Sequence, residues 1–418
     1  MSSTTLSESA ARIAADVQTL SGPEYTLPGT GISRYAYVDV YANTLAFFER
    51  AFRAIGHEVS YDPVGTLIAS NVEPGERCLG LGSHCDSIRN GGRYDGTLGV
   101  VVALEVCRLA SEQGLELPLR VLSFLEEEAS GFGQALLGSS IMLGLTTDEE
   151  LASYRDGQGV PFPEAARAAG HAPERHRESI RALDGMAGWI EVHIEQGRVL
   201  WDTGERLGVV DAIAGFVHAD LTIEGRADHA GATPMGFRSD AGLTAAEVVV
   251  ELDRLTRAAG GDTVGTAGEL DLEPGLINVI PGAARMSLDV RSTSGAHVRV
   301  ADAVVAHARE RAAARGQAVT YVVRRAVAPT PMDPAIVEAL SFATERTGEP
   351  WRRMPSGAAH DTMNVARKVP SAMLFVPCRE GISHAPDEHA EPADAALAAH
   401  VVLEAAAGLM DGDEPLGG

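Results

Sequence analysis

The stretch Leu81–Val100, "LGSHCDSIRNGGRYDGTLGV", places histidine and aspartate side chains among glycines directly after an apolar run. The run that leads into it, "ERCLGLGSHC", is typical of a short buried strand whose carboxyl end carries polar groups. A helix is predicted over "GTLGVVVALEVCRLASEQG", and a second buried strand, "LPLRVLSFLEEE", ends in three glutamates. Strand, helix and strand with polar chemistry at the strand ends indicate an α/β fold class.

The sequence changes in character at about Phe216. From there "FVHADLTIEGRA" alternates like a half-buried strand, "SDAGLTAAEVVVELDRLTRAA" is predicted to be a helix, and further strands and another helix follow, up to "AVTYVVRRA". This β-α-β-β-α-β order is that of a ferredoxin-like α+β unit. Because "SAMLFVPC" then resumes the buried-strand pattern, we predict a discontinuous domain of residues 1–214 and 328–418 with an inserted domain of residues 215–327.

Length, charge and cysteine usage bound the class of protein. A chain of 418 residues with 45% hydrophobic residues is long enough for two globular domains. Its net charge of −24 disfavours nucleic acid and anionic membranes as partners. The sequence shows no secretory signal, no apolar run approaching the roughly 18 residues of a membrane span and no CxxC pair among its four cysteines. We therefore expect a cytoplasmic protein.

Metal-ligand side chains recur at the ends of predicted strands. His84, Glu127–Glu128, His193 and His384 each close or follow an apolar run, and Asp95 lies in the glycine-rich stretch. Taken singly, each has an ordinary explanation as a turn residue or a solvated carboxylate. The recurrence favours a metal site, because half-buried charges need a partner or an ion. Imidazole and carboxylate together suit Zn²⁺, Mn²⁺ or similar ions, and an aspartate can bridge two of them.

The chain resembles the M20 metallopeptidase family and, within it, the amidase, hydantoinase/carbamoylase group. That group holds N-carbamoyl-L-amino acid hydrolases, β-ureidopropionases and allantoate amidohydrolases. The resemblance runs from about Gly82 to Glu388 and rests on the motifs "GSHCDSIRNGGRYDGTLGV", "EEEASGF", "HIEQG", "DHAGATPM", "NVIPG", "LDVRS", "SGAAHD" and "GISHAPDE". It implies an aminopeptidase-like catalytic domain with a mixed sheet flanked by helices, and an inserted lid and dimerisation domain.

The resemblance also implies roles for the matching residues. Glu127 would be the general base, and Asp86 would orient His84. The peptide bond Asp95–Gly96 would be cis. The cofactor would be two divalent metal ions, Zn²⁺ or Mn²⁺, with Co²⁺ or Ni²⁺ as further options. Their implied ligands are His84, Asp95 and His193 for one ion, and Asp95, Glu128 and His384 for the other, with Asp95 bridging.

A further set of matching residues is implied to contact the substrate. His229 resembles the donor that stabilises the oxyanion, and because the neighbouring subunit commonly supplies it, the resemblance implies a homodimer. Asn278 and Arg291 match the pair that holds the substrate's carboxylate, which suits the fork of a guanidinium. Gln196 would contact the ureido or amide group, and His360 would lie near the site. Since Arg291 and His229 fall in the inserted domain, we expect domain closure during catalysis.

The favoured activity is hydrolysis of a small N-carbamoyl amino acid to ammonia, CO₂ and the amino acid. Allantoate amidohydrolase, or aminoacylase and dipeptidase activity, are the enzymatic alternatives, and a metal-stabilised scaffold without activity is the non-enzymatic one. The family usually reads Glu-Glu-Glu-Gly-Ser-Arg-Phe where this chain reads "EEEASGF", so Ala129 replaces a glycine and Gly131 replaces an arginine. Residues Phe216 to His218 also stand where members often carry basic residues. The first departure bears on the substrate rather than on the metal site, and the second bears on the substrate or the interface.

Overall fold

The computed structural model describes residues 3–411, which form two compact units. Unit 1 holds the described residues up to Asp211, together with Met332–Met354 and those from Ala359 onward. Unit 2 holds Ala212–Pro331 and Pro355–Ala358. The insert expected over residues 215–327 falls inside unit 2.

The larger sheet is mixed and has nine strands, in the order β1-β2-β4-β3-β5-β16-β6-β14 with β15 beside β6. Its central strands run parallel: β3 (Cys78–His84), β4 (Leu119–Phe124), β5 (Met186–Ile194) and β16 (Ser371–Val376). Because parallel strands end at the same edge of a sheet, the polar residues that close or follow them lie at that edge. The remaining strands are β1 (Glu58–Tyr61), β2 (Leu67–Ser70), β6 (Leu207–Ile213), β14 (Thr330–Pro331) and β15 (Trp351–Ser356).

Helices flank this sheet, which confirms the predicted α/β class. α3 (Thr97–Glu112) contacts β3, β4 and β5, and α12 (Pro392–Asp411) contacts β3 and β16. A cluster of buried side chains, including Phe124 and Trp189, joins the sheet to α4 (Leu137–Met142) and α11 (Thr362–Val365). The other helical segments of unit 1 are α1 (Ser3–Leu20), α2 (Asp39–Ala54), α5 (Asp148–Ser153), α6 (Phe162–Ala168), η1 (Pro173–Leu183), α7 (Val199–Thr203), α10 (Pro334–Glu345) and η3 (Arg379–Gly381).

Helix α12 is the one helix among the described residues that is long and apolar enough to cross a membrane. However, 72% of its most apolar window is buried inside the protein. It packs against α1, α3 and α10. A helix that is apolar on all sides and covered in this way is typical of the core of a large domain.

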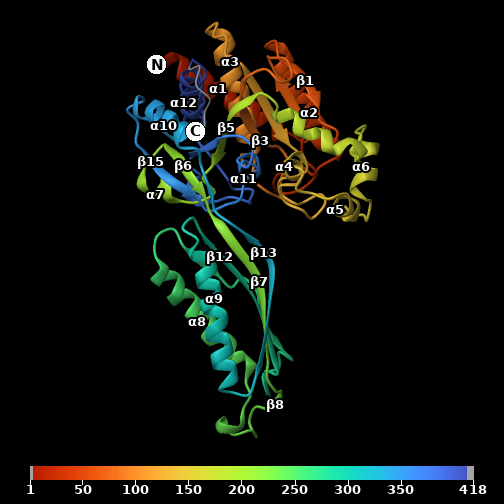
Figure 1. Cartoon of the computed structure of the whole chain (residues 1–418), viewed down its shortest axis with the longest axis vertical. Helices are drawn as coiled ribbons and strands as arrows, with labels where there is room; N and C mark the ends of the chain where they lie inside the picture. Colours follow the sequence, from red (N-terminus) through yellow and green to blue (C-terminus); the bar gives the residue numbers. More distant parts are fainter. Residues whose placement is uncertain (1–2, 412–418) are drawn as a thin grey trace. The chain divides into compact units, whose positions relative to one another are not determined.

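Unit 2 contains a five-stranded antiparallel sheet in the order β10-β12-β7-β13, with β9 beside β12. Helices α8 (Ala241–Ala259) and α9 (Ala296–Ala313) lie on one face of this sheet (Figure 1), where Val217, Leu221 and Val290 belong to the buried core. A two-stranded ribbon of β8 (Asp228–His229) and β11 (Val279–Ile280) stands apart from it, and η2 (Met235–Phe237) follows β8. The strands of the sheet are β7 (Gly215–Glu224), β9 (Val264–Thr266), β10 (Leu270–Glu273), β12 (Ala283–Ser292) and β13 (Ala318–Val327).

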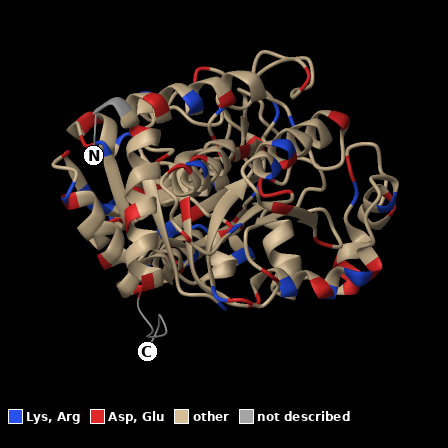
Figure 2. Ribbon diagram, turned by 90° about the horizontal axis from the view of Figure 1, so that it is seen from above, with Lys and Arg blue, Asp and Glu red and all other residues tan. Residues whose placement is uncertain are grey.

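Two further features bear on expectations from the sequence. Figure 2 shows acidic residues interspersed with basic ones along many helices and loops, so the net charge of −24 does not come from one segment.

The expectation of a cis peptide bond at Asp95–Gly96 is wrong: among residues 3–411 the cis peptide bond is Glu273–Pro274. The chain instead turns at Gly96 through a φ of 61°, a backbone conformation that glycine adopts without steric cost.

Candidate metal centre

The parallel strands bring three histidines to one carboxylate, that of Asp95. Nε2 of His193 lies 3.2 Å from Oδ1 of Asp95, and Nε2 of His84 lies 3.7 Å from the same oxygen. Nε2 of His384 approaches the other oxygen, Oδ2, at 3.1 Å. His84 closes β3, His193 lies in β5 and His384 follows β16, so residues distant in the sequence meet at the carboxyl edge of the sheet.

Two groups of potential ligands share Asp95, and in each group the ligand atoms lie within 4.8 Å of one another. Oε2 of Glu128 completes the second group and lies 3.5 Å from Nε2 of His384. Mixed imidazole and carboxylate donors suit Zn²⁺ and Mn²⁺, and the two oxygens of one aspartate can serve two ions. The two groups are His84, Asp95 and His193, and Asp95, Glu128 and His384, the same sets that the resemblance implies.

The electrostatics of these residues also fit cations. Burial by itself would raise the pKa of Asp95, but the hydrogen bonds with His193 and His384 outweigh it and hold the pKa well below its ordinary value. Burial and the neighbouring Asp95 raise the pKa of Glu128 to about 7, and the hydrogen bond to Asp95 raises that of His384 to about 9. Carboxylates crowded into a buried place take up protons unless positive charge accompanies them, and bound divalent ions supply that charge.

The backbone around the cluster is held in sparsely populated conformations. Glu126, Ala129, Gln196 and His384 all have φ between 54° and 62°. A non-glycine residue in this region costs on the order of 1–3 kcal/mol and persists where the surroundings impose it. These residues lie on the turns that follow β4, β5 and β16, so the strain is concentrated where ligand side chains must be aimed.

Asp86 is fully buried and holds three parts of the site together. Its Oδ1 accepts a hydrogen bond from the backbone N–H of Glu127 at 3.1 Å, and its Oδ2 accepts one from that of Glu128 at 2.9 Å. Nδ1 of His84 lies 3.5 Å from Oδ1 and 3.2 Å from the main-chain oxygen of Asp86. Asp86 therefore sits where it can orient His84, and it also fixes the turn that carries both glutamates.

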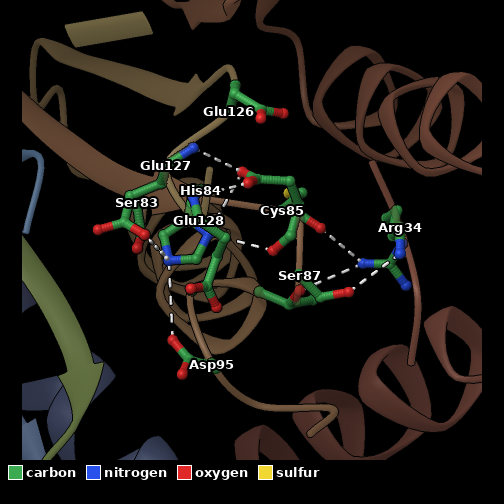
Figure 3. Close-up of polar contacts among 12 residues, drawn as sticks. Arg34, Ser83, His84, Cys85, Ser87, Asp95, Glu126, Glu127 and Glu128 are labelled. Atoms are coloured by element: carbon green, nitrogen blue, oxygen red, sulfur yellow. Dashed lines mark hydrogen bonds and ion pairs between the residues drawn. The ribbon is translucent and has the colours of Figure 1, made fainter. Parts of the chain in front are cut away.

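Glu127 occupies the position expected of a base beside the ligands. Its Oε2 lies 3.7 Å from Nε2 of His84, and its side chain is largely buried. Burial, followed by the repulsion of Glu128, raises the pKa of Glu127 well above its ordinary value. Figure 3 shows Glu126 directed away from His84 and Asp95, so adjacent glutamates of the "EEE" run face different surroundings.

Two of the expected substrate residues also lie at this cluster. Nε2 of Gln196 donates to Oδ2 of Asp95 at 2.8 Å. The ring of His360 packs edge-on against that of His193, with centroids 4.6 Å apart. Burial and the nearby His193 lower the pKa of His360 well below its ordinary value, so this imidazole is neutral at physiological pH. Because Gln196 already contacts Asp95, its polar tip can reach a group bound there.

The other expected residues lie in unit 2, at opposite ends of its sheet. Arg291 pairs with Phe216 in the register of β12 and β7, whereas Ala283 pairs with Glu224 at the far end, roughly 26 Å away along the strand. His229 and Asn278 lie beyond that far end, in and beside the β8–β11 ribbon, where the N–H of Ala230 donates to the oxygen of Asn278 at 3.0 Å. Within one chain, the structure does not bring Asn278 to Arg291.

Two residues of the site were missed by the reading of the sequence. Oε1 of Glu388 accepts hydrogen bonds from the backbone N–H groups of Tyr94 and Asp95, at 2.8 and 3.0 Å. Oγ of Ser383 lies 3.0 Å from both Oδ2 of Asp95 and Oε2 of Glu388, within hydrogen-bonding distance of each carboxylate. Both residues belong to the motif "GISHAPDE", so the motif itself was the available signal, although only His384 was assigned from it.

The altered motif "EEEASGF" leaves Glu126 as a structural group of the turn. Its Oε1 accepts hydrogen bonds from the backbone N–H groups of Gly131 and Phe132, both at 2.6 Å. A Cβ at position 131 would approach Oε2 of Glu126 to 2.5 Å, so any side chain there requires Glu126 to move. Burial, followed by the charge of Asp86, raises the pKa of Glu126 to about 8. The glycine at 131 thus fits the closure of this turn.

The fold and this cluster of ligands together define a metal-dependent hydrolase. The chain matches the family model described as peptidase family M20/M25/M40 over residues 80–407, and it belongs to that family. It is 35% identical over 399 residues to the N-carbamoyl-L-amino-acid amidohydrolase of Paenarthrobacter aurescens, which covers 94% of this chain and 96% of that protein. It is 32% identical over 378 residues to the allantoate amidohydrolase of Escherichia coli (strain K12), covering 88% and 90% respectively.

A solved structure shows the same fold along almost the whole chain. The amidase of the hydantoinase/carbamoylase family from Burkholderia multivorans is 30% identical, with a TM-score of 0.89, and the match covers 97% of this chain and 98% of that one. The resemblance inferred from the motifs is therefore confirmed at the level of the family. The named relatives are hydrolases of C–N bonds.

Proposed function

We propose that this protein is a binuclear metal-dependent amidohydrolase that cleaves the C–N bond of a small N-carbamoyl amino acid. The observation that carries the proposal is the position of Asp95, whose two carboxylate oxygens face two different groups of ligands. In the reaction R–NH–CO–NH₂ and H₂O give R–NH₂, CO₂ and NH₃. The similarity to N-carbamoyl-L-amino-acid amidohydrolases from three organisms supports a ureido substrate.

The donor set fits Zn²⁺ or Mn²⁺ and also accommodates Co²⁺ or Ni²⁺. When bound, two such cations would lower the pKa of a water molecule and polarise the carbamoyl oxygen. The chain's own contribution is to fix the ligands: the backbone N–H of Glu128 is held by Asp86, and Asp95 is held by Glu388 and Ser383. The proposed ligands are His84, Asp95 and His193 for one ion, and Asp95, Glu128 and His384 for the other.

Glu127 is the residue we propose as general base and acid. Its carboxylate lies beside His84 and Glu128, where it can accept a proton from the attacking water and then donate it to the leaving nitrogen. Gln196 reaches Asp95 and can hydrogen bond to the ureido group. His360, neutral and buried against His193, supports the wall of the site. Arg291 offers a guanidinium for the α-carboxylate of the substrate.

We further propose a homodimer in which each copy completes the site of the other. His229 and Asn278 lie at the opposite end of the unit 2 sheet from Arg291, so in one chain they cannot contact the carboxylate that Arg291 holds. A second copy can supply both, with His229 as the donor to the developing oxyanion.

The four cysteines are free and buried, which agrees with a location in the reducing cytoplasm.

Subunit mixing tests this arrangement. His229→Ala and Glu127→Gln each inactivate a homodimer, but a mixed dimer combines an intact Glu127 with an intact His229 from the partner in one of its two sites. Random mixing is expected to restore about a quarter of the wild-type activity, because half of the dimers are mixed and half of their sites are complete. A mixture that stays as inactive as its parents would show that His229 acts within its own chain or not at all.

A substrate screen tests the reaction itself. Protein reconstituted with Mn²⁺ is expected to hydrolyse N-carbamoyl amino acids, with release of ammonia as the measurement. Turnover of N-acetyl amino acids without any turnover of ureido acids would overturn the carbamoylase assignment in favour of aminoacylase activity. Allantoate belongs in the same screen as the second candidate, since the chain is also similar to an allantoate amidohydrolase.

A further inference from the structure

The sheet of unit 2 carries a compact charged cluster on the face away from its helices. Phe216 stands opposite Arg291 in the register of β7 and β12, and His218 stands opposite Asp289 on β12 and Arg325 on β13. The alternate residues of these strands, such as Val217 and Val290, are buried in the core formed with α8 and α9. Since side chains alternate between the faces of a strand, the cluster residues share the open face.

Two guanidinium groups converge on one aromatic ring in this cluster. The guanidinium carbons of Arg291 and Arg325 each lie 5.8 Å from the centroid of the Phe216 ring. The ring of His218 stacks on Phe216 with centroids 4.4 Å apart. The two guanidinium carbons are therefore separated by no more than twice the cation–ring distance, on the order of one Debye length.

Only one of these two cations has a carboxylate partner. Asp289 takes the Nε and Nη2 edge of Arg291, at 3.0 and 2.8 Å, and Nη1 of Arg291 donates to the oxygen of Gly357 at 2.9 Å. Within residues 3–411, Arg325 has no ion pair with any carboxylate, and its side chain is exposed. Burial, assisted by the two arginines, lowers the pKa of His218, so this imidazole adds no charge at neutral pH.

We propose that Arg325 is a specificity-determining residue that binds a second carboxylate of the substrate. The preferred substrate class is then the N-carbamoyl derivative of an acidic, dicarboxylic amino acid. Arg291 holds its α-carboxylate and Arg325 its side-chain carboxylate. This inference rests on the proposed function, because it takes Arg291 as the α-carboxylate site. Arg325, the cation without a carboxylate partner, selects for a second negative charge on the substrate, because a neutral side chain leaves its guanidinium without an ionic partner.

The test compares two substrates that differ in charge but hardly in shape, N-carbamoyl-aspartate and N-carbamoyl-asparagine. For Arg325→Gln, kcat/KM on the aspartate derivative is expected to fall about 10–100-fold, with little change on the asparagine derivative. Arg324→Gln is the matched control. Arg324 is the neighbouring residue at the bulge of β13, and it already pairs with Asp220. The Arg324→Gln substitution removes the same charge as Arg325→Gln, but it is expected to leave kcat/KM on both substrates unchanged.

Each outcome bears on the proposal. Equal losses on both substrates, or equal losses in the two variants, would overturn it in favour of general electrostatics. If the wild-type protein hydrolyses neither these two substrates nor any other N-carbamoyl amino acid, the proposed function fails while Arg325 is still tested, by calorimetric binding of succinate and of its monoamide, succinamate. A preference for succinate that disappears in Arg325→Gln supports the second anion site, and a preference that is absent or survives unchanged overturns it.

Discussion

Oε1 of Glu388 accepts a hydrogen bond from the backbone N–H of Asp95 at 3.0 Å, across 293 residues of sequence. The same oxygen accepts a second hydrogen bond, from the N–H of Tyr94. Ser383 connects Oε2 of Glu388 to Oδ2 of Asp95. The loop that carries His384 is thereby tied to the loop that carries the proposed bridging carboxylate, so that both sets of ligands depend on one buried carboxyl group.

Replacement of Glu388 by alanine is therefore expected to weaken metal binding by about 10–100-fold, the usual effect of removing a group that orients a ligand. Glu388→Gln is the matched variant, because its amide oxygen can still accept from Tyr94 and Asp95, and it should retain most of the affinity. Titration of metal-free protein with Zn²⁺ or Mn²⁺ by calorimetry measures both. Equal affinities for the alanine variant and the wild type would show that Asp95 is held by other contacts.

Glu127→Gln is expected to lower kcat by about 10²–10⁴-fold without loss of metal, because it removes the proton carrier and keeps the shape of the side chain. Elemental analysis of the purified variant measures the metal content alongside the rate. Glu128→Gln is the control: it alters a proposed ligand, so it should lose metal and activity together. A Glu127→Gln variant with an unchanged rate would remove Glu127 from the mechanism.

Chelation is expected to destabilise unit 1 as well as to abolish turnover. Five proposed ligands converge on a buried place, and ions that bind only the folded state add about 2.7 kcal/mol to the free energy of unfolding at a concentration of 100 Kd. Calorimetry before and after chelation should show the melting temperature fall and recover when Mn²⁺ is restored. An unchanged melting temperature and rate after complete removal of metal would contradict the metal centre.

The sequence predicts those features of the fold and the site whose pattern lies within one short segment of the chain. His84, the Glu127–Glu128 pair and His193 close or follow strands that are buried along all or nearly all of their length, so apolar runs ending in ligand-type residues indicated both the parallel sheet and the edge that carries the site. His384 could be anticipated in the same way from the run before it. The grouping of these residues into two sets, however, came from the resemblance to a family, because spacing alone does not say which strand ends are neighbours.

Other features depend on three-dimensional packing and left no local trace. The hydrogen bonds of Glu388 to the N–H groups of Tyr94 and Asp95 join segments that are far apart in the chain. From the sequence alone, a glutamate in a loop is expected to be solvated. The separation of Asn278 from Arg291 likewise follows from the length of β12 and its antiparallel register, which the sequence did not fix. The backbone at Asp95–Gly96 was wrongly expected to be cis, because a positive φ at Gly96 turns the chain equally well.

The stability of unit 2 is expected to depend on pH through Glu247, which joins α8 to α9. Its carboxylate accepts hydrogen bonds from Arg315 and Arg311 at 2.7–3.0 Å, and these two partners lower its pKa from about 4.5 to about 2. A carboxyl group whose pKa falls on folding stabilises the folded state above its unfolded pKa. That stabilisation disappears as the pH falls from about 4.5 towards 2.

Glu247→Gln should therefore lower the free energy of unfolding by about 1 kcal/mol at pH 7, a modest value because the pair is partly solvated. The loss should become progressively smaller below pH 4. Thermal unfolding of metal-free protein at pH 7 and pH 3 measures the difference. Glu251→Gln, which affects only a pair within α8, is the control, and a Glu247→Gln deficit that is the same at both pH values would contradict the linkage.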